Sequence, residues 1–164
     1  MASGRPLEGL RVVEMSHMVM GPSAGMFLAF LGAEVIKIEP PDGDKTRNLT
    51  GMGAGFFPTF NRGKKSVTLD IKDENDLARL HALLKTADVF VENFRDETLA
   101  KMGLAPEQLR QKNPRLIVAS CKGFLKGPKD IAGKSKIAKT RAVAEEYTIA
   151  PNETGANGKS HVAS

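Results

Sequence analysis

The segment Leu10–Glu39 reads LRVVEMSHMVMGPSAGMFLAFLGAEVIKIE, and its pattern decides the fold. The apolar residues at 10–15 predict a first strand, and those at 34–39 predict a second. Between them, Ser23–Leu31 contains only small and apolar residues, which is typical of a helix that is buried on most sides. A strand–helix–strand unit with connections this short predicts a parallel pair joined by a crossover helix.

The same alternation continues to residue 120. Three further strands are predicted near residues 66–71, 88–92 and 115–120, and helices near 73–85, 97–102 and 106–111. Alternating strands and helices indicate an α/β fold, here a Rossmann-like parallel sheet with flanking helices. The intervening segment 42–60 contains four glycines and is predicted to be a functional or mobile loop.

A basic turn leads into the third predicted strand. Residues 61–72 read NRGKKSVTLDIK, so that Arg62, Lys64 and Lys65 crowd one end of the strand and Lys72 lies at the other. Two interpretations are open. The segment is either a solvated basic turn before an edge strand or a phosphate-binding edge of the sheet.

Composition limits the class of partner. The 164 residues are enough for one domain with a core, and 41% hydrophobic with 26% charged residues is ordinary for a soluble globular protein. A formal net charge of +5 favours an anionic partner. With no Trp and one Tyr, the chain lacks the aromatic series on which single-strand binders stack bases, so we expect no nucleic-acid partner.

Cysteine use and hydropathy bear on the compartment. The lone Cys121 rules out an intramolecular disulfide and suits a reducing environment. The start of the chain has no apolar h-region, and no apolar run is long enough to span a bilayer. We therefore expect a cytoplasmic protein with no membrane partner.

The composition changes after Leu125. Residues 126–164 contain no Leu, Phe or Met and are rich in Lys, Gly and Asn, so they can bury little apolar surface. We expect a globular part at residues 1–125 and a divergent, poorly ordered tail at 126–164.

Polar residues follow several predicted strands, at the sheet edge where ligands of parallel sheets bind. They are His17 after the first strand, Asn93 and Arg95 after the fourth, and Lys122 after the fifth. Each alone is ordinary: a hydrogen-bonding loop residue, a turn, a surface cation. Together with Lys72, the last three are predicted to face a common cleft.

Six motifs, in this order and spacing, resemble the N-terminal part of the class III CoA-transferases. That family includes formyl-CoA transferase, the carnitine CoA-transferases and the 2-methylacyl-CoA racemases. The resemblance covers about residues 6 to 128. It is carried by PLEGLRVV at 6–13, GP at 21–22, LGAEVIKIEPP at 31–41, NRGKKS at 61–66, ADVFVENFR at 87–95 and NPRLI at 113–117.

The resemblance implies a Rossmann-like large domain, incomplete in this chain, that belongs to an interlocked homodimer. It implies an acyl-CoA donor and a carboxylic acid acceptor, with coenzyme A as a substrate rather than a cofactor, and no metal site. Carried over by position, the family's CoA contacts fall on the main chain of Val19 and Met20 and on Leu69, Lys72, Asn93, Phe94, Arg95, Lys101 and Lys122. Cations among these suit the phosphates of the ligand. Pro40 stands where some members have an Arg, so one contact near the adenine is not reproduced.

The family's catalytic residue is an aspartate whose carboxylate attacks the acyl-CoA thioester. Its aligned place falls just beyond Ser164, and Asp130 is the only Asp after Leu125 and lies too early. The sequence therefore predicts no catalytic residue in this chain: a truncated CoA-transferase by descent that is inactive by itself. Two alternatives stay open, a non-catalytic CoA-binding fragment and a fragment of a 2-methylacyl-CoA racemase.

Overall fold

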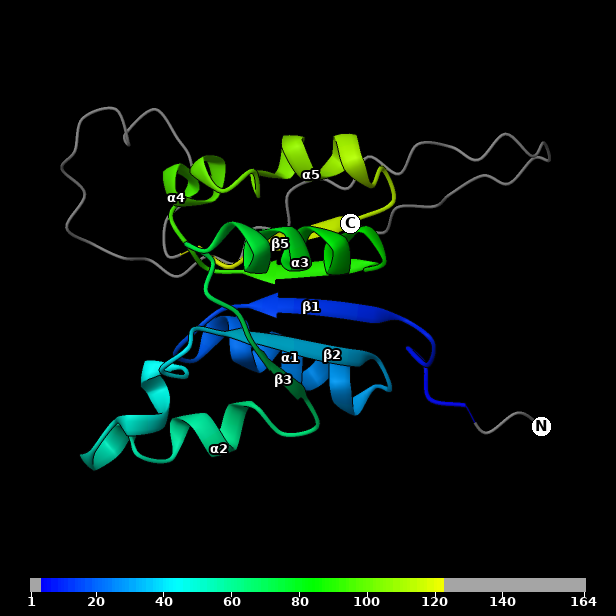
Figure 1. Cartoon of the computed structure of the whole chain (residues 1–164). Helices are drawn as coiled ribbons and strands as arrows, with labels where there is room; N and C mark the ends of the chain where they lie inside the picture. Colours follow the sequence, from blue (N-terminus) through cyan, green and yellow to red (C-terminus); the bar gives the residue numbers. More distant parts are fainter. Residues whose placement is uncertain (1–3, 123–164) are drawn as a thin grey trace, which may run out of the picture. The chain divides into compact units, whose positions relative to one another are not determined.

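The computed structural model describes residues 4–122, and the predicted tail at 126–164, with Asp130, lies outside this range. The described chain contains a five-stranded sheet in the order β3-β2-β1-β4-β5, in which every pairing is parallel (Figure 1). This confirms the predicted Rossmann-like parallel sheet. The strands are β1 Arg11–Met15, β2 Glu34–Glu39, β3 Lys65–Thr68, β4 Val89–Glu92 and β5 Ile117–Ser120.

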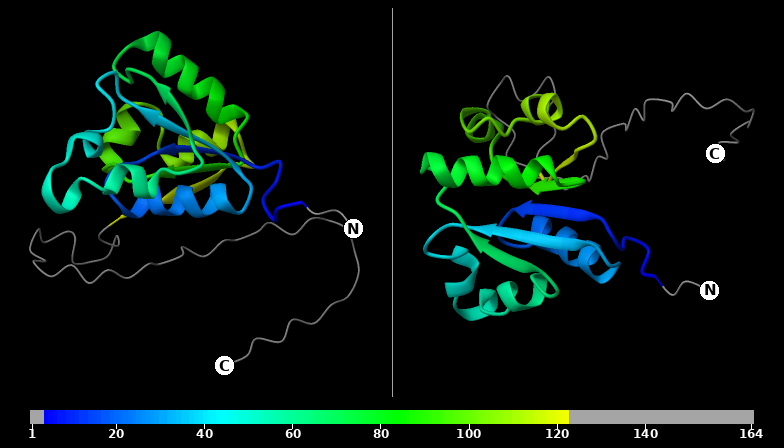
Figure 2. Two further views of the ribbon diagram at one scale, coloured as in Figure 1. Left: turned by 90° about the horizontal axis from the view of Figure 1, so that it is seen from below. Right: turned by 45° about the vertical axis from the view of Figure 1, so that its right-hand side comes forward.

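Helices cover both faces of the sheet. Helix α1, Met20–Phe30, lies on one face, and α3, Glu74–Lys85, lies on the other (Figure 2). Two short helices follow β4: α4, Asp96–Lys101, and α5, Pro106–Lys112. None of the helices within residues 4–122 has the length and hydropathy needed to cross a bilayer.

The alternation of side chains along the strands creates two separate cores. Val13 of β1 belongs to a cluster with Phe90 of β4 and the leucines of α3, α4 and α5. Its neighbour Val12 points to the opposite face and packs in a smaller cluster with Ala29 of α1. The two-faced burial explains why apolar residues stand at adjacent positions in β1, β2 and β4.

Helix α1 begins three residues earlier than the sequence predicted. Pro22 lies in its first turn, where the missing N–H has no intrahelical partner to lose. Gly32 follows the helix with a φ of +110°, and an added Cβ there would lie 2.5 Å from the Cβ of Arg5. A glycine is therefore required where the chain turns into β2.

The prediction of a loop at 42–60 was wrong in detail. The segment forms two 3-10 turns, η1 Lys45–Asn48 and η2 Gly51–Gly53, and a short helix, α2 Phe56–Phe60. β3 is also shorter than predicted, because the chain leaves the sheet after Thr68.

Glu39, at the end of β2, anchors this segment. Arg47 donates to both carboxylate oxygens of Glu39, at 2.7 and 2.8 Å, and its guanidinium lies 3.7 Å from the centroid of the Phe57 ring. The Ser66 hydroxyl and the main-chain N–H of Asp44 also donate to Glu39, at 2.7 and 2.9 Å. A bidentate guanidinium–carboxylate pair with further donors is a strong arrangement.

We predict that Glu39 makes folding sensitive to acid. The Arg47 guanidinium, aided by Ser66 and the Asp44 N–H, overcomes the effect of burial and lowers the pKa of Glu39 from 4.5 to about 2. Because the folded pKa is depressed, this stabilisation is present above pH 4.5 and is lost as the pH falls toward 2. Urea titrations should show the free energy of unfolding of wild type falling relative to Glu39→Gln over this range, by at most about 1.4 kcal/mol per pH unit.

The matched control is the same substitution in an Arg47→Met background, where most of this pH dependence should disappear. If the difference in the free energy of unfolding between wild type and Glu39→Gln does not change with pH, then the Glu39–Arg47 pair does not couple folding to protonation.

Candidate functional site

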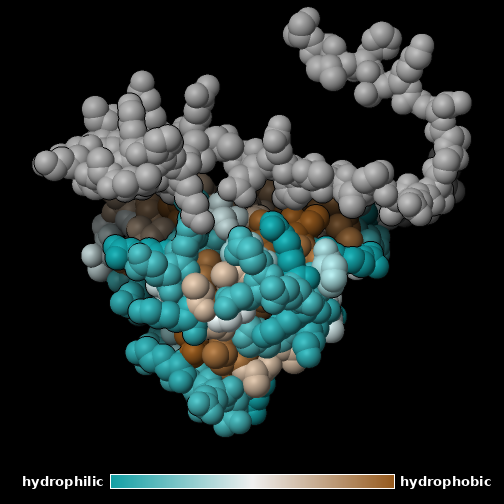
Figure 3. Space-filling model, turned by 90° about the horizontal axis from the view of Figure 1, so that it is seen from above, coloured by the Kyte–Doolittle hydropathy of each residue, from teal (hydrophilic) through white to brown (hydrophobic). Residues whose placement is uncertain are grey.

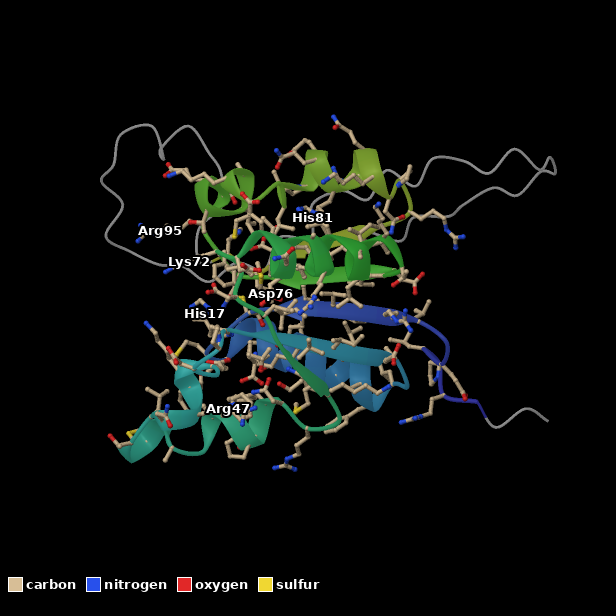
Figure 4. The ribbon with its side chains drawn as sticks, in the orientation of Figure 1. His17, Arg47, Lys72, Asp76, His81 and Arg95 are labelled. Atoms are coloured by element: carbon tan, nitrogen blue, oxygen red, sulfur yellow. The ribbon has the colours of Figure 1, made fainter. Side chains whose placement is uncertain are left out.

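The sheet order places a topological switch point between β1 and β4. The chain runs outward from β1 to β2 and β3, then crosses to β4 and β5 on the other side. In open parallel sheets, ligands bind beyond the carboxyl ends of the strands at such a point. Figure 4 shows His17, Lys72 and Arg95 along this edge of the sheet, at the left of the view. We take this edge as the candidate site.

Asn93 joins the segments that follow β1 and β4. The main-chain N–H of His17 donates to Asn93 Oδ1 at 3.1 Å, and Asn93 Nδ2 donates to the carbonyl of His17 at 2.8 Å. The rings of His17 and Phe94 meet edge to face, with centroids 5.6 Å apart. Two residues predicted to contact coenzyme A, Asn93 and Phe94, therefore hold the turn after β1 in place.

The N-terminus of α1 opens at the same edge. Val19 is the N-cap residue, its side chain makes no capping hydrogen bond, and the first helical turn contains no acidic residue. An N-terminus of this kind favours an anion through its main-chain N–H groups and helix dipole. Gly21 lets the helix start approach the turn, because an added Cβ would lie 2.4 Å from the Cβ of Ser16. The predicted main-chain contacts of Val19 and Met20 lie at this opening.

Three predicted cations are exposed. Lys72 lies between β3 and α3, Arg95 is the N-cap residue of α4, and Lys101 ends α4. None of the three forms an ion pair with another residue in the described part of the chain. Their charges are therefore available to an anionic ligand.

Two other predicted contacts are engaged within the fold, Lys122 while partly exposed and Leu69 while buried. Lys122 Nζ lies 2.8 Å from Glu92 Oε1 and 3.3 Å from Asp96 Oδ1, and it also donates to the carbonyl of Phe94. The side chain of Leu69 is buried in the core cluster with Val13. Lys122 thus balances the buried Glu92 carboxylate, and Leu69 presents only its main chain to this edge.

A buried ionic cluster that was not predicted from the sequence lies beneath the turn after β1. It consists of Glu14, Lys37, Asp44 and Lys64, whose side chains are at most 4% exposed. Lys37 Nζ lies 3.2 Å from Glu14 Oε1 and 3.0 Å from Asp44 Oδ2, and Lys64 Nζ lies 2.6 Å from Glu14 Oε2. Charged residues inside otherwise apolar strands, at Glu14 and Lys37, were the pattern that could have revealed it.

The cluster combines two carboxylates with two ammonium groups, so its formal charge is zero. Burial lowers the pKa of Lys64, and the nearby Glu14 carboxylate offsets part of that effect. Burial raises the pKa of Asp44, but hydrogen bonds from Thr46 and the Lys37 ammonium outweigh it and leave the pKa lowered. Buried charges persist in a protein interior when they are paired and hydrogen-bonded in this way.

Within residues 4–122, no group of three or more His, Cys, Asp or Glu side chains is arranged to hold a metal ion. Figure 3 shows the surface from above, and the coloured part of that surface is mainly hydrophilic. Large apolar side chains are instead exposed on and beside α1, at Met20, Phe27, Phe30 and Leu31.

Comparisons with known proteins agree in pointing to one family. The model of CoA-transferase family III matches residues 7–151. This match extends past residue 128, where the resemblance of the sequence motifs to the family ends. The chain is 41% identical over 130 residues to formyl-CoA:oxalate CoA-transferase of Streptomyces coelicolor, covering 77% of this chain and 32% of that protein. It is 42% identical over 130 residues to succinate–glutarate CoA-transferase of Agrobacterium fabrum, covering 73% and 32%.

Solved structures agree with the fold. A CAIB/BAIF family protein from Brucella suis superposes with a TM-score of 0.71 at 41% identity, over 77% of this chain and 36% of that one. The chain spans about a third of the length of the curated relatives that it matches.

We predict that Gly25 of α1 is required by the ionic cluster. A Cβ at this position would lie 1.9 Å from Glu14 Oε2 and 3.2 Å from Lys64 Cε. Gly25→Ala should therefore lower the melting temperature, although alanine is favoured over glycine in a helix by about 1 kcal/mol. Thermal unfolding followed by circular dichroism measures the effect.

Gly55→Ala is the matched control, because the nearest atom to an added Cβ there is Thr59 Oγ1 at 4.0 Å. Gly55 is the N-cap residue of α2, where glycine is preferred over alanine, so this change should lower the melting temperature only slightly and by less than Gly25→Ala does. Equal or higher stability of Gly25→Ala would show that the cluster tolerates displacement.

Proposed function

The chain belongs to CoA-transferase family III, and from that premise we propose that its described residues bind coenzyme A for transfer from an acyl thioester to a carboxylic acid. The named relatives support this class of substrate. One acts on formyl-CoA and oxalate by its name, and another on succinate and glutarate.

The observation that carries the proposal is the open edge at the β1–β4 switch point. It combines an uncapped helix N-terminus with the exposed cations Lys72 and Arg95. Coenzyme A carries a diphosphate and a 3′-phosphate, which need main-chain donors and several positive charges. In the proposed site the main chain of Val19 and Met20 and the cations Lys72, Arg95 and Lys101 contact the ligand.

The remaining predicted residues have supporting roles in this proposal. Asn93 and Phe94 hold the turn after β1, and Lys122 keeps the Glu92 carboxylate neutralised. Leu69 contributes its main chain, since its side chain is buried.

Transfer also needs a carboxylate that can attack the thioester carbonyl and release the coenzyme A thiolate. Three carboxylates at this edge, Glu14, Glu39 and Glu92, are buried and paired with Lys or Arg. A carboxylate held in this way is a poor nucleophile. We therefore propose that the described residues bind coenzyme A and that these three carboxylates do not supply the nucleophile.

Calorimetric titration of the polypeptide with coenzyme A tests the binding proposal. Arg95→Gln and Lys72→Gln should each raise the dissociation constant by about ten- to a hundredfold, the effect of losing one charged hydrogen bond. Lys112→Gln, at the end of α5 on the opposite edge of the sheet, should leave it unchanged. Dephospho-CoA, which lacks the 3′-phosphate, should bind more weakly than coenzyme A.

The same preparation should form no oxalyl-CoA from formyl-CoA and oxalate, and no glutaryl-CoA from succinyl-CoA and glutarate, above the uncatalysed rate. Binding that is unaffected by either edge variant would place the ligand elsewhere. Turnover by the polypeptide would reveal a nucleophile within its 164 residues and contradict the inactivity expected from the sequence.

A homodimer belongs to the same proposal. The apolar side chains Phe27, Phe30 and Leu31 are 45 to 61% exposed, a surface that supports association with a second copy. Sedimentation velocity should show a dimer whose fraction rises with concentration. The double variant Phe27→Ser, Phe30→Ser should remain monomeric. A concentration of about 100 μM lies near the weak end of specific association. A wild-type polypeptide that is still monomeric there would contradict the proposed dimer.

A further inference from the structure

The turn after β1 contains a backbone conformation that a methionine rarely adopts. Met18 has a φ of +68°, the single positive value at a residue other than glycine among residues 4–122. The left-handed region costs conformational energy for a side chain with a Cβ, and such residues persist where neighbouring contacts fix them. Met18 adjoins Val19, the N-cap residue of the opening proposed to receive the ligand.

Side chains from distant parts of the sequence hold the main chain around Met18. Its own N–H donates to Thr46 Oγ1 at 3.2 Å, and the Thr46 hydroxyl donates to Asp44 Oδ1 at 2.6 Å. Lys37 Nζ donates to the carbonyl of Ser16 at 2.7 Å. The groups on either side of His17 are therefore tied to β2 and to the segment that follows it.

Two further contacts complete the restraint. Asn93 binds both main-chain groups of His17, and Lys64 Nζ donates to the carbonyl of Pro22 at 2.9 Å. The turn is thus fixed from β2, from the segment after β2 and from the residue after β4, and the first turn of α1 is fixed from the turn before β3.

We propose that Thr46 and Lys37 are positioning residues, which hold the Ser16–Met18 turn so that the adjoining α1 N-terminus faces the ligand. The inference rests on the proposed coenzyme A site. It assigns to that site two residues, Thr46 and Lys37, that support it without touching the ligand. Thr46 is 2% exposed and Lys37 is 1% exposed, so both act through the main chain of the turn.

Thr46 gives the cleaner test of the two. Thr46→Val keeps the shape of the side chain and removes the acceptor for the Met18 N–H. Asp44 keeps the main-chain N–H of Thr46 at 2.8 Å and the Lys37 ammonium at 3.0 Å, so the ionic cluster stays paired. Thr46→Ser restores the hydroxyl and is the conservative rescue. Thr59→Val on the exposed surface of α2 is the control for replacing threonine by valine.

Two readouts separate positioning from general stability. Amide hydrogen exchange by NMR should show faster exchange at Met18 in Thr46→Val, with no change at Ser23, whose N–H bonds to the carbonyl of Val19 at 2.8 Å. Calorimetry should show the dissociation constant for coenzyme A raised by about three- to tenfold in Thr46→Val and restored in Thr46→Ser.

The outcomes are distinguishable. If wild type binds no coenzyme A, the proposed function fails, and the exchange rate of Met18 alone then decides whether Thr46 fixes the turn. Unchanged exchange at Met18 in Thr46→Val overturns the inference. So does equal weakening of coenzyme A binding in the valine and serine variants, because the hydroxyl would then have no positioning role.

Discussion

The pairing of Glu14 with Lys37 across β1 and β2 is the interaction on which the rest of this edge depends. The two residues are register partners in adjacent parallel strands, and both are fully buried. A single buried charge would be costly, so each must be matched, and Asp44 and Lys64 complete a neutral set. Each partner comes from a different segment, and satisfying the charges therefore brings those segments together. Gly25 leaves the space for this cluster beneath α1.

The two-sided sheet explains why chemistry concentrates at one edge. Both faces are closed by apolar clusters, with α1 on one side and α3, α4 and α5 on the other. At the carboxyl ends of β1, β2 and β4, the buried carboxylates of Glu14, Glu39 and Glu92 each pair with a Lys or Arg side chain. Each arrangement fixes a connecting segment, so the edge is rigid below its surface while Lys72 and Arg95 stay exposed above it.

Much of the fold could be predicted from the sequence, because continuous apolar runs and helix-ending glycines are local patterns. The five strands and the helices between them follow from those patterns. The segment 42–60 could not be predicted, because its structure depends on Arg47 reaching Glu39 across eight residues and on the Phe57 ring beneath the guanidinium. The end of β3 at Thr68 was missed for a similar reason. The alternation continues through Ile71, but the strand has no pairing partner there.

The site shows a limit of carrying residues over from a family. A ligand contact and a positioning contact both require a polar side chain at the end of a strand, so one motif is compatible with either role. The contacts that each side chain makes within the fold differ along the motif. The amide of Asn93 uses its oxygen and its nitrogen on His17, and the ammonium of Lys122 lies among Glu92, Asp96 and the carbonyl of Phe94. Arg95 lies two residues after Asn93 and keeps its guanidinium exposed. Within the single motif Asn93–Arg95, the first residue therefore holds the turn after β1, and the third keeps its guanidinium exposed.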